Sequence, residues 1–142
     1  MKTLTMRLTI AAALVGAAAG SAWAQHYEAK IPMAFSVGDK QMTPGSYQIF
    51  VNTGGSLPMV TVRNTATHSS AILVTRARSD TPKAWRQDGK PVIAFDCLNG
   101  NCALRKLWNG RDDSIYQFPG LKLRGAEAER ASLITLPLNK AD

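Results

Sequence analysis

The chain has 142 residues, with 17 lysines and arginines against 10 aspartates and glutamates, for a net charge of +7. This length accommodates one domain with a single core rather than two. The basic residues are spread along the chain without the interleaved aromatic side chains that stack on bases, so the composition argues against a nucleic-acid partner.

The first 24 residues have the features of a secretory signal peptide. Two basic residues precede an apolar run, residues 8–19, that is too short to span a bilayer, and the A-x-A motif ending at Ala24 fits a cleavage site. We predict cleavage before Gln25, which leaves residues 25–142 as a single β-domain with a net charge of +5. No later apolar run approaches membrane-spanning length. The sequence therefore predicts a secreted or periplasmic protein.

Short apolar runs separated by turn residues predict an all-β fold. Between Ile31 and Val51, two extended segments each place larger apolar side chains on one face, with glycine and proline between them. Further short strands are expected at 59–63, 71–74, 92–97, 102–108, 115–118 and 133–138. We predict a single antiparallel sandwich or partly closed barrel of about seven to nine strands, with one short helix at 125–131. The expected core residues are Phe35, Val37, Tyr47, Ile49, Val60, Val62, Ile72, Val74, Ile93, Phe95, Leu104, Leu107 and Leu136.

The segment between Arg76 and Pro91 is the longest predicted loop and the best candidate for a binding surface. Trp85 is the one side chain there that is large enough to hold a ligand by stacking, and Arg76 and Arg78 form a tight basic group at the start of the loop. We identify these three as candidate binding residues. The alternative, which we prefer for the tryptophan, is that it covers the open end of the core while the arginines are solvated.

Asn99-Gly100 is the strongest turn signal, because both residues tolerate the positive φ of a type I′ hairpin turn. A two-residue turn there pairs Cys97 with Cys102 across the strands, with α-carbons roughly 4.5 Å apart, which a disulfide accepts. These are the only two cysteines of the chain. In an exported protein we predict a structural disulfide, rather than a redox pair or half of a metal site.

Several of these residues form a pattern that runs through most of the mature chain. The first hairpin contains the signature F-x-V-G…P-G-x-Y, from Phe35 to Tyr47, and the segments 103–108 (ALRKLW) and 126–130 (AEAER) follow. With these motifs the chain resembles a family of small exported acidobacterial-type proteins that has no assigned activity. The resemblance implies export and an all-β fold but no catalytic residue. Relatives carry aromatic residues near the positions of Cys97 and Cys102, so a disulfide here would replace a cross-strand aromatic contact.

No residue pattern typical of catalysis is present, and we predict no catalytic residue, no metal site and no cofactor. The only histidines are His26 and His68, and the sequence contains no nucleophilic triad, phosphate-binding loop or metal-ligand cluster. The alternative is a small secreted hydrolase or metal-dependent enzyme whose site is assembled from scattered residues such as His68, Asp112 and Asp113. Convergence of that histidine with acidic residues in one pocket would favour the enzyme.

The sequence thus favours an exported non-catalytic β-domain with a structural or binding role. Its partner would be a protein or glycan of the cell envelope, contacted through loops or a sheet edge. Assembly into a fibre through exposed edge strands is a third possibility, although no donor segment is recognisable in the sequence.

Overall fold

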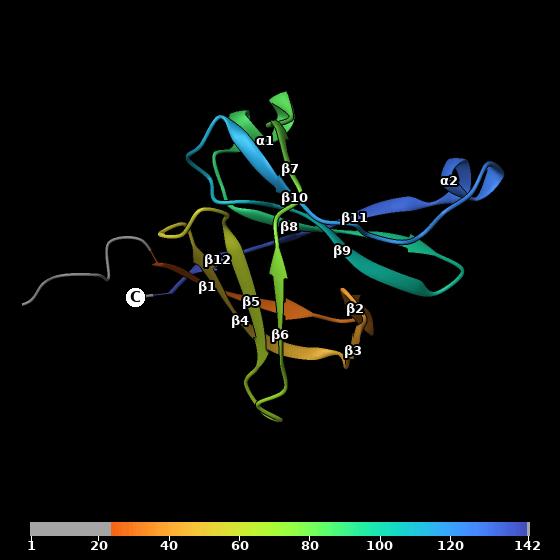
Figure 1. Ribbon diagram of the computed structural model, residues 1–142, viewed down its shortest axis with the longest axis horizontal. Helices are drawn as coiled ribbons and strands as arrows, with labels where there is room; N and C mark the ends of the chain where they lie inside the picture. The colour runs from red at the N-terminus through yellow and green to blue at the C-terminus, as the bar shows by residue number, and fades with distance from the viewer. Residues whose placement is uncertain (1–23, 142) are drawn as a thin grey trace, which may run out of the picture.

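The computed structural model describes residues 24–141, which form two β-sheets and two short helices (Figure 1). The elements are β1 (Ala24–Ile31), β2 (Phe35–Val37), β3 (Lys40–Met42), β4 (Gly45–Asn52), β5 (Met59–Asn64), β6 (Ser70–Val74), β7 (Ala77–Asp80), α1 (Lys83–Asp88), β8 (Val92–Leu98), β9 (Asn101–Trp108), β10 (Ser114–Gln117), α2 (Ala126–Arg130), β11 (Ser132–Pro137) and β12 (Asn139–Lys140). Residues 1–23 of the predicted signal peptide lie outside the described residues. Within residues 24–141, no helix is long and apolar enough to cross a membrane.

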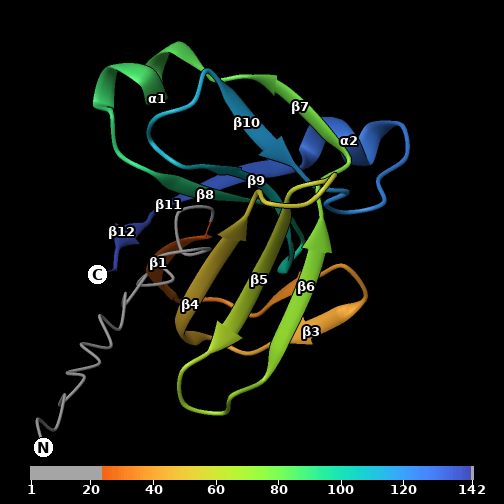
Figure 2. The same ribbon diagram turned by 60° about the vertical axis from the view of Figure 1, so that its left-hand side comes forward.

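The two sheets pack face to face as a sandwich (Figure 2). Sheet A has the order β12-β1-β4-β5-β6, and sheet B has the order β11-β8-β9-β10-β7, with β2 paired to β9 and β3 paired to β2. We predicted either a sandwich or a partly closed barrel. The sheets do not close into a barrel, so the structure confirms the sandwich. The described residues form twelve strands, which is more than predicted. Strands as short as β3, β7 and β12 contain too few residues to show an apolar alternation, so the sequence does not reveal them.

The core lies between the two sheets and confirms most of the expected residues. Phe35 is 1 % exposed and contacts Tyr47 of sheet A and Phe95 of sheet B edge-to-face, with ring centroids 5.1 Å and 5.2 Å apart. The alternating face of β4 is buried as expected, and Leu136 is partly buried against the core. One aromatic residue near the start of the domain thus joins the two sheets.

The expectation that Ile72 and Val74 belong to the core is wrong. They are 64 % and 44 % exposed, whereas Ala71 is buried and Leu73 packs against the core. The side chains of β6 that were expected to face the core therefore face solvent, and their neighbours face the core. Because side chains alternate along a strand, a shift of one residue moves the whole apolar set from the core to solvent.

The segment predicted as the longest loop contains β7 and α1, and the expectation of a single helix is therefore wrong. Helix α1 follows Pro82 and ends at Gly89, which has a φ of 69° and donates its N–H to the carbonyl oxygen of Trp85 at 2.9 Å. No residue of α1 is buried. A helix without a buried face carries no apolar periodicity, so composition alone could not reveal it. The predicted helix at 125–131 is confirmed as α2.

The β8–β9 hairpin is as predicted. Asn99 and Gly100 have φ values of 51° and 80°, the positive values that a type I′ turn requires. Cys97 pairs with Cys102, and the two form a disulfide with α-carbons 4.1 Å apart. Both cysteines are more than nine-tenths buried.

The chain passes from one sheet to the other four times, between β1 and β2, β3 and β4, β6 and β7, and β11 and β12. Between β6 and β7, the N–H of Arg76 donates to the carbonyl oxygen of Gln117 in sheet B at 3.1 Å. Between β11 and β12, the N–H of Leu138 donates to the carbonyl oxygen of Pro91 at 3.0 Å. Sheet A ends at β12 and β6, and sheet B ends at β11 and β7, so the sandwich carries strand edges that other chains could meet.

Candidate binding site

Strand β6 is an edge of sheet A, since among residues 24–141 it pairs only with β5. Hydrogen bonds at both of its ends define which backbone groups face β5. The N–H of Thr75 donates to the carbonyl oxygen of Pro58 at 3.1 Å, and the N–H of Asn64 donates to that of Ser69 at 2.8 Å. Both bonds belong to one continuous register, in which residue 59 is opposite residue 74.

Hydrogen-bonded and non-hydrogen-bonded pairs alternate along an antiparallel ladder. The pairs 58/75 and 64/69 are hydrogen-bonded, so every second residue between them is bonded as well. Ala71 and Leu73 therefore bond to β5, while the N–H and C=O groups of Ile72 and Val74 point away from the sheet. No hydrogen bond from another described residue reaches these four outward groups. The middle of β6 is therefore an open backbone edge.

Exposed apolar side chains accompany this edge. Ile72 and Val74 lie on the outer face of sheet A, where Val74 is paired with Met59, which is 40 % exposed. Leu57, just before β5, is 57 % exposed. We call these four side chains and the open edge the β6 surface. Contiguous exposed apolar residues of this kind mark interaction sites in soluble proteins.

Cationic side chains flank the β6 surface at both ends. At the start of β6, the Lys40 ammonium donates to the carbonyl oxygen of Ser70 at 2.7 Å, and Arg63 is paired with Ser70 across the strands. Beyond the other end lies Arg76, which is exposed. Neither β5 nor β6 contains an acidic residue. The surface therefore combines an apolar middle with positive ends.

Two of the three candidate binding residues lie beside this surface. Arg76 and Arg78 line a recess of about 360 Å³ together with Leu57, Pro58 and Thr75. The Arg78 guanidinium also lies over the ring of a neighbouring aromatic residue, Tyr116, 5.5 Å from its centroid. A cation held over a ring keeps its charge at a defined place.

Trp85, the third candidate, lies on α1 and is not part of that recess. Its side chain is half-buried but does not belong to the core cluster. Helix α1 is held to the β9–β10 loop by Arg86, which donates to the carbonyl oxygen of Asp113 at 3.2 Å. A binding role for Trp85 stays a prediction.

Burial, and then the nearby Asp112 carboxylate, raises the pKa of Tyr116 above its ordinary value of 10.0. Above pH 10 the phenol ionises in the unfolded chain before it does so in the folded protein, which then binds more protons, so stability falls as pH rises. We expect the melting temperature of Tyr116→Phe to decline less steeply above about pH 10 than that of the wild type. Thermal unfolding over a pH series measures this, and equal slopes would contradict it.

The residues named for the enzyme alternative lie in separate networks. His68, in the β5–β6 turn, has its Nδ1 3.1 Å from the Arg63 guanidinium and is exposed. Asp112 accepts hydrogen bonds from the Asn109 amide at 2.9 Å and the Tyr116 hydroxyl at 3.4 Å. Residues 24–141 contain no group of three or more His, Cys, Asp or Glu side chains that could hold a metal ion.

His26, the other histidine, lies on the outer face of sheet A. Its ring stacks on Phe50 with centroids 4.4 Å apart, and its Nε2 atom is buried without a hydrogen-bond partner among the described residues. The ring contact, rather than any ligand atom, accounts for its placement.

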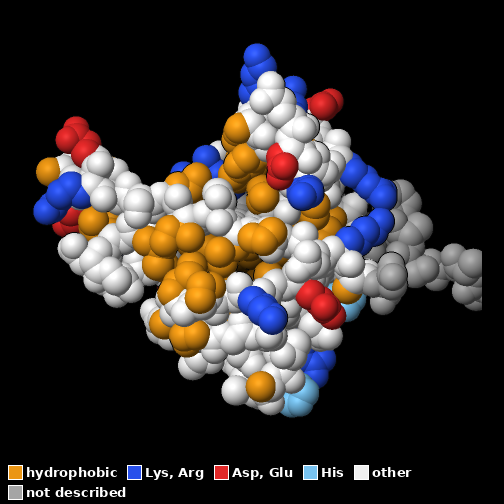
Figure 3. Space-filling view, turned by 180° about the vertical axis from the view of Figure 1, so that it is seen from behind, with side chains coloured by type: hydrophobic (Ala, Val, Ile, Leu, Met, Phe, Trp, Pro, Cys, Tyr) orange, Lys and Arg blue, Asp and Glu red, His pale blue; other side chains and the backbone are white. Residues whose placement is uncertain are grey.

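A second apolar area is visible on the face seen from behind the view of Figure 1 (Figure 3). Ile134 on β11 is 37 % exposed. Two adjoining recesses of about 570 Å³ and 350 Å³ share Lys30 and Ser46. Lys30 lies on β1 beyond its pairing with β12, and Pro137, which has no N–H, lies on the edge strand β11. Lysine and proline are residues that protect sheet edges from pairing, whereas the middle of β6 has neither.

Comparison with known proteins assigns no family to the chain. Neither a protein-family model, nor a curated protein, nor a solved structure matches it. The function is therefore argued from the surfaces and contacts themselves.

Proposed function

We propose that this chain is an exported, non-catalytic binding domain whose β6 surface takes up an extended peptide segment of a partner protein by strand addition. In this mode the peptide adds a strand to an open edge, main-chain hydrogen bonds supply affinity, and alternate side chains supply specificity. One observation carries the proposal: Ile72 and Val74 have both outward-pointing backbone groups and exposed apolar side chains.

Two features support export to the periplasm or the outside of the cell. The sequence of residues 1–24 has the order of a secretory signal peptide. The buried Cys97–Cys102 disulfide fits an oxidising compartment. Together they argue for a partner among the proteins of the cell envelope or its surroundings.

The charges around the edge define the chemistry of the peptide. Lys40 and Arg63 lie at one end of the β6 surface and Arg76 at the other. A complementary segment has two apolar side chains at alternate positions, to meet Ile72 and Val74, and acidic residues on both sides of them. Opposite charges at the rim steer association and fix the register of the added strand.

A second copy of this chain is a poorer occupant of the same edge. In a symmetric antiparallel pair centred on Ile72, the end that carries Arg76 in one copy would meet the end that carries Lys40 and Arg63 in the other. Like charges placed together oppose association. The edge therefore favours an acidic peptide over self-pairing.

Replacing Ile72 with proline tests the proposal. The N–H of Ile72 points away from β5, so proline removes a donor needed by the peptide without removing a bond of sheet A. We expect the affinity for a synthetic peptide with two valines at alternate positions between aspartates to fall at least about tenfold, since a lost main-chain bond leaves its partner unpaired. Titration calorimetry measures the affinity, and circular dichroism checks that the variant folds.

Strand β11, an edge of sheet B, supplies a matched control. Counting from the bond between Leu138 and Pro91, the N–H of Leu133 on β11 also points outward. Leu133→Pro should therefore leave peptide binding unchanged. Equal affinity of the wild type and Ile72→Pro, or equal loss in both proline variants, would refute strand addition at β6. Self-association that Ile72→Pro abolishes in sedimentation equilibrium would instead make a second copy the occupant.

A further inference from the structure

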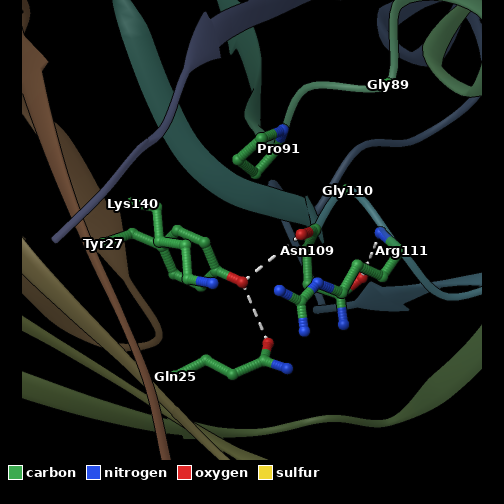
Figure 4. Close-up of a pocket in the computed structure, with 8 residues that line it drawn as sticks. All are labelled: Gln25, Tyr27, Gly89, Pro91, Asn109, Gly110, Arg111 and Lys140. Atoms are coloured by element: carbon green, nitrogen blue, oxygen red, sulfur yellow. Dashed lines mark hydrogen bonds between the residues drawn. The ribbon is translucent and has the colours of Figure 1, made fainter. Parts of the chain in front are cut away.

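A small recess at one end of the sandwich gathers basic side chains from distant parts of the sequence (Figure 4). It has a volume of about 160 Å³ and is lined by Gln25 and Tyr27 of β1, Lys140 of β12, Pro91 before β8, and Arg111 after β9. Strand pairing places Tyr27 directly opposite Lys140. The recess is separate from the β6 surface, which shares no residue with it.

The hydrogen bonds within the recess occupy acceptor groups, whereas several N–H donors that line it have no partner among the described residues. The Tyr27 hydroxyl donates to the Gln25 side-chain oxygen at 2.9 Å and lies 3.4 Å from the carbonyl oxygen of Asn109, so its proton is engaged. Among the described residues, no hydrogen bond or ion pair engages the Arg111 guanidinium, the Lys140 ammonium or the amide nitrogen of Gln25. A group that only accepts hydrogen bonds would satisfy all three.

The loop that carries Arg111 is fixed in place. The side-chain oxygen of Asn109 accepts the backbone N–H groups of Arg111 and Asp112, each at 3.0 Å, and its amide nitrogen donates to the Asp112 carboxylate at 2.9 Å. Gly110 has a φ of 83°, and a Cβ atom there would lie 3.1 Å from Pro91, so the loop packs closely against the start of β8. Asn109 thus orders the turn and also engages the Asp112 carboxylate.

We infer that this recess is a binding site for a small carboxylate with a short apolar end. The planar guanidinium of Arg111 matches the two oxygens of a carboxylate, and Lys140 adds a second positive charge. The Tyr27 ring and Pro91 supply apolar walls that a phosphate or sulfate ion would leave unused. The volume is below that of pockets for drug-sized ligands, so the ligand has few heavy atoms or is the end of a chain.

The electrostatics of Tyr27 agree with this assignment. Burial raises the pKa of its hydroxyl, and the strongest charge acting on it is the Arg111 guanidinium, which opposes that rise. The influences of Tyr116 and Asp112 are weaker. The Arg111 guanidinium is therefore close enough to the Tyr27 hydroxyl to act on its pKa.

Acetate and propionate, with acetamide as the uncharged analogue, are the probes for the test. In amide-resolved NMR titrations of the purified protein, we expect saturable shifts at the amides of residues 25, 27, 110, 111 and 140 with both acids and none with acetamide. Arg111→Gln should weaken binding at least about tenfold, because the bidentate contact and its charge are both lost. Arg111→Lys, which keeps the charge but not the fork, should weaken it less.

Arg124→Gln is the matched control, because Arg124 is an exposed arginine outside the recess. It should bind both acids as the wild type does. A tripeptide with a free carboxyl terminus and its amidated form distinguish a chain end from a free small acid as the source of the carboxylate. The assignment is overturned if no carboxylate gives saturable shifts, if acetamide binds equally well, if inorganic phosphate binds more tightly than propionate, or if Arg124→Gln loses as much affinity as Arg111→Gln.

Discussion

Replacing Phe35 with alanine is expected to lower the free energy of unfolding by about 3–5 kcal/mol, the range found for truncating buried aromatic side chains. The Phe35 ring is 1 % exposed and lies between Tyr47 on sheet A and Phe95 on sheet B. Removing it deletes contacts to both sheets at once and leaves a cavity between them. Neighbours held in two separate sheets cannot easily collapse into that space.

Phe50→Ala is the matched control for this prediction. Phe50 lies on the outer face of β4, is only partly buried, and stacks on His26. Its loss should cost about 1 kcal/mol, because a partly buried ring on the outer face leaves no internal cavity. Equilibrium unfolding in urea measures both variants. A smaller destabilisation by Phe35→Ala than by Phe50→Ala would show that the inter-sheet contact is not central to the core.

Replacing both Cys97 and Cys102 with alanine is expected to lower stability by about 2 kcal/mol. The disulfide joins residues that are already paired across a two-residue turn, so the loop it closes is short and the entropic gain is modest. Alanine is preferred to serine because both positions are buried, and a hydroxyl there would need a new partner.

Reduction provides an independent measurement of the same bond. Wild-type protein unfolded in urea with an excess of a thiol reductant should approach the stability of the Cys97→Ala/Cys102→Ala variant, and the variant itself should not respond to the reductant. Identical stability of the oxidised wild type and the double variant would mean that the turn alone holds the hairpin.

The sequence predicted the β8–β9 hairpin accurately because a strong local signal determines it. Asn99-Gly100 accepts the positive φ values of a type I′ turn, and a two-residue turn fixes the pairings next to it, including that of Cys97 with Cys102. Farther from the turn, the register shifts between Ala94 and Phe95. Where turn chemistry sets the register, a single sequence is sufficient.

The same reasoning failed at β6, which is the centre of the proposed site. Residues 71–74 are four consecutive apolar residues, so alternation gives no preference for either facing. Tertiary packing selects Ala71 and Leu73 for the interior, where Leu73 meets the turn between β2 and β3: a Cβ on Gly38 would lie 3.1 Å from it. The position of a strand at a sheet edge also depends on how the sheets assemble. No local sequence pattern indicates it.

The sequence singled out only some of the residues at the two proposed sites. Arg76 and Arg78 stood out as a tight basic group and do line a recess beside the β6 surface. The sequence did not reveal the recess proposed to bind a carboxylate, because Tyr27, Arg111 and Lys140 are far apart in the sequence. They come together only through the pairing of β1 with β12 and the packing of the β9–β10 loop. No spacing pattern connects them.

The pairing of β1 with β12 also has a consequence for how the chain reaches its native state. The first and last strands of the described chain are neighbours in sheet A, and β11, just before β12, covers the edge of β8. Neither sheet is complete until residues 132–140 have left the ribosome, and closing so long a loop is entropically slow. The complete native sheets therefore form later than local hairpins such as β8–β9, whose strands are joined by a two-residue turn.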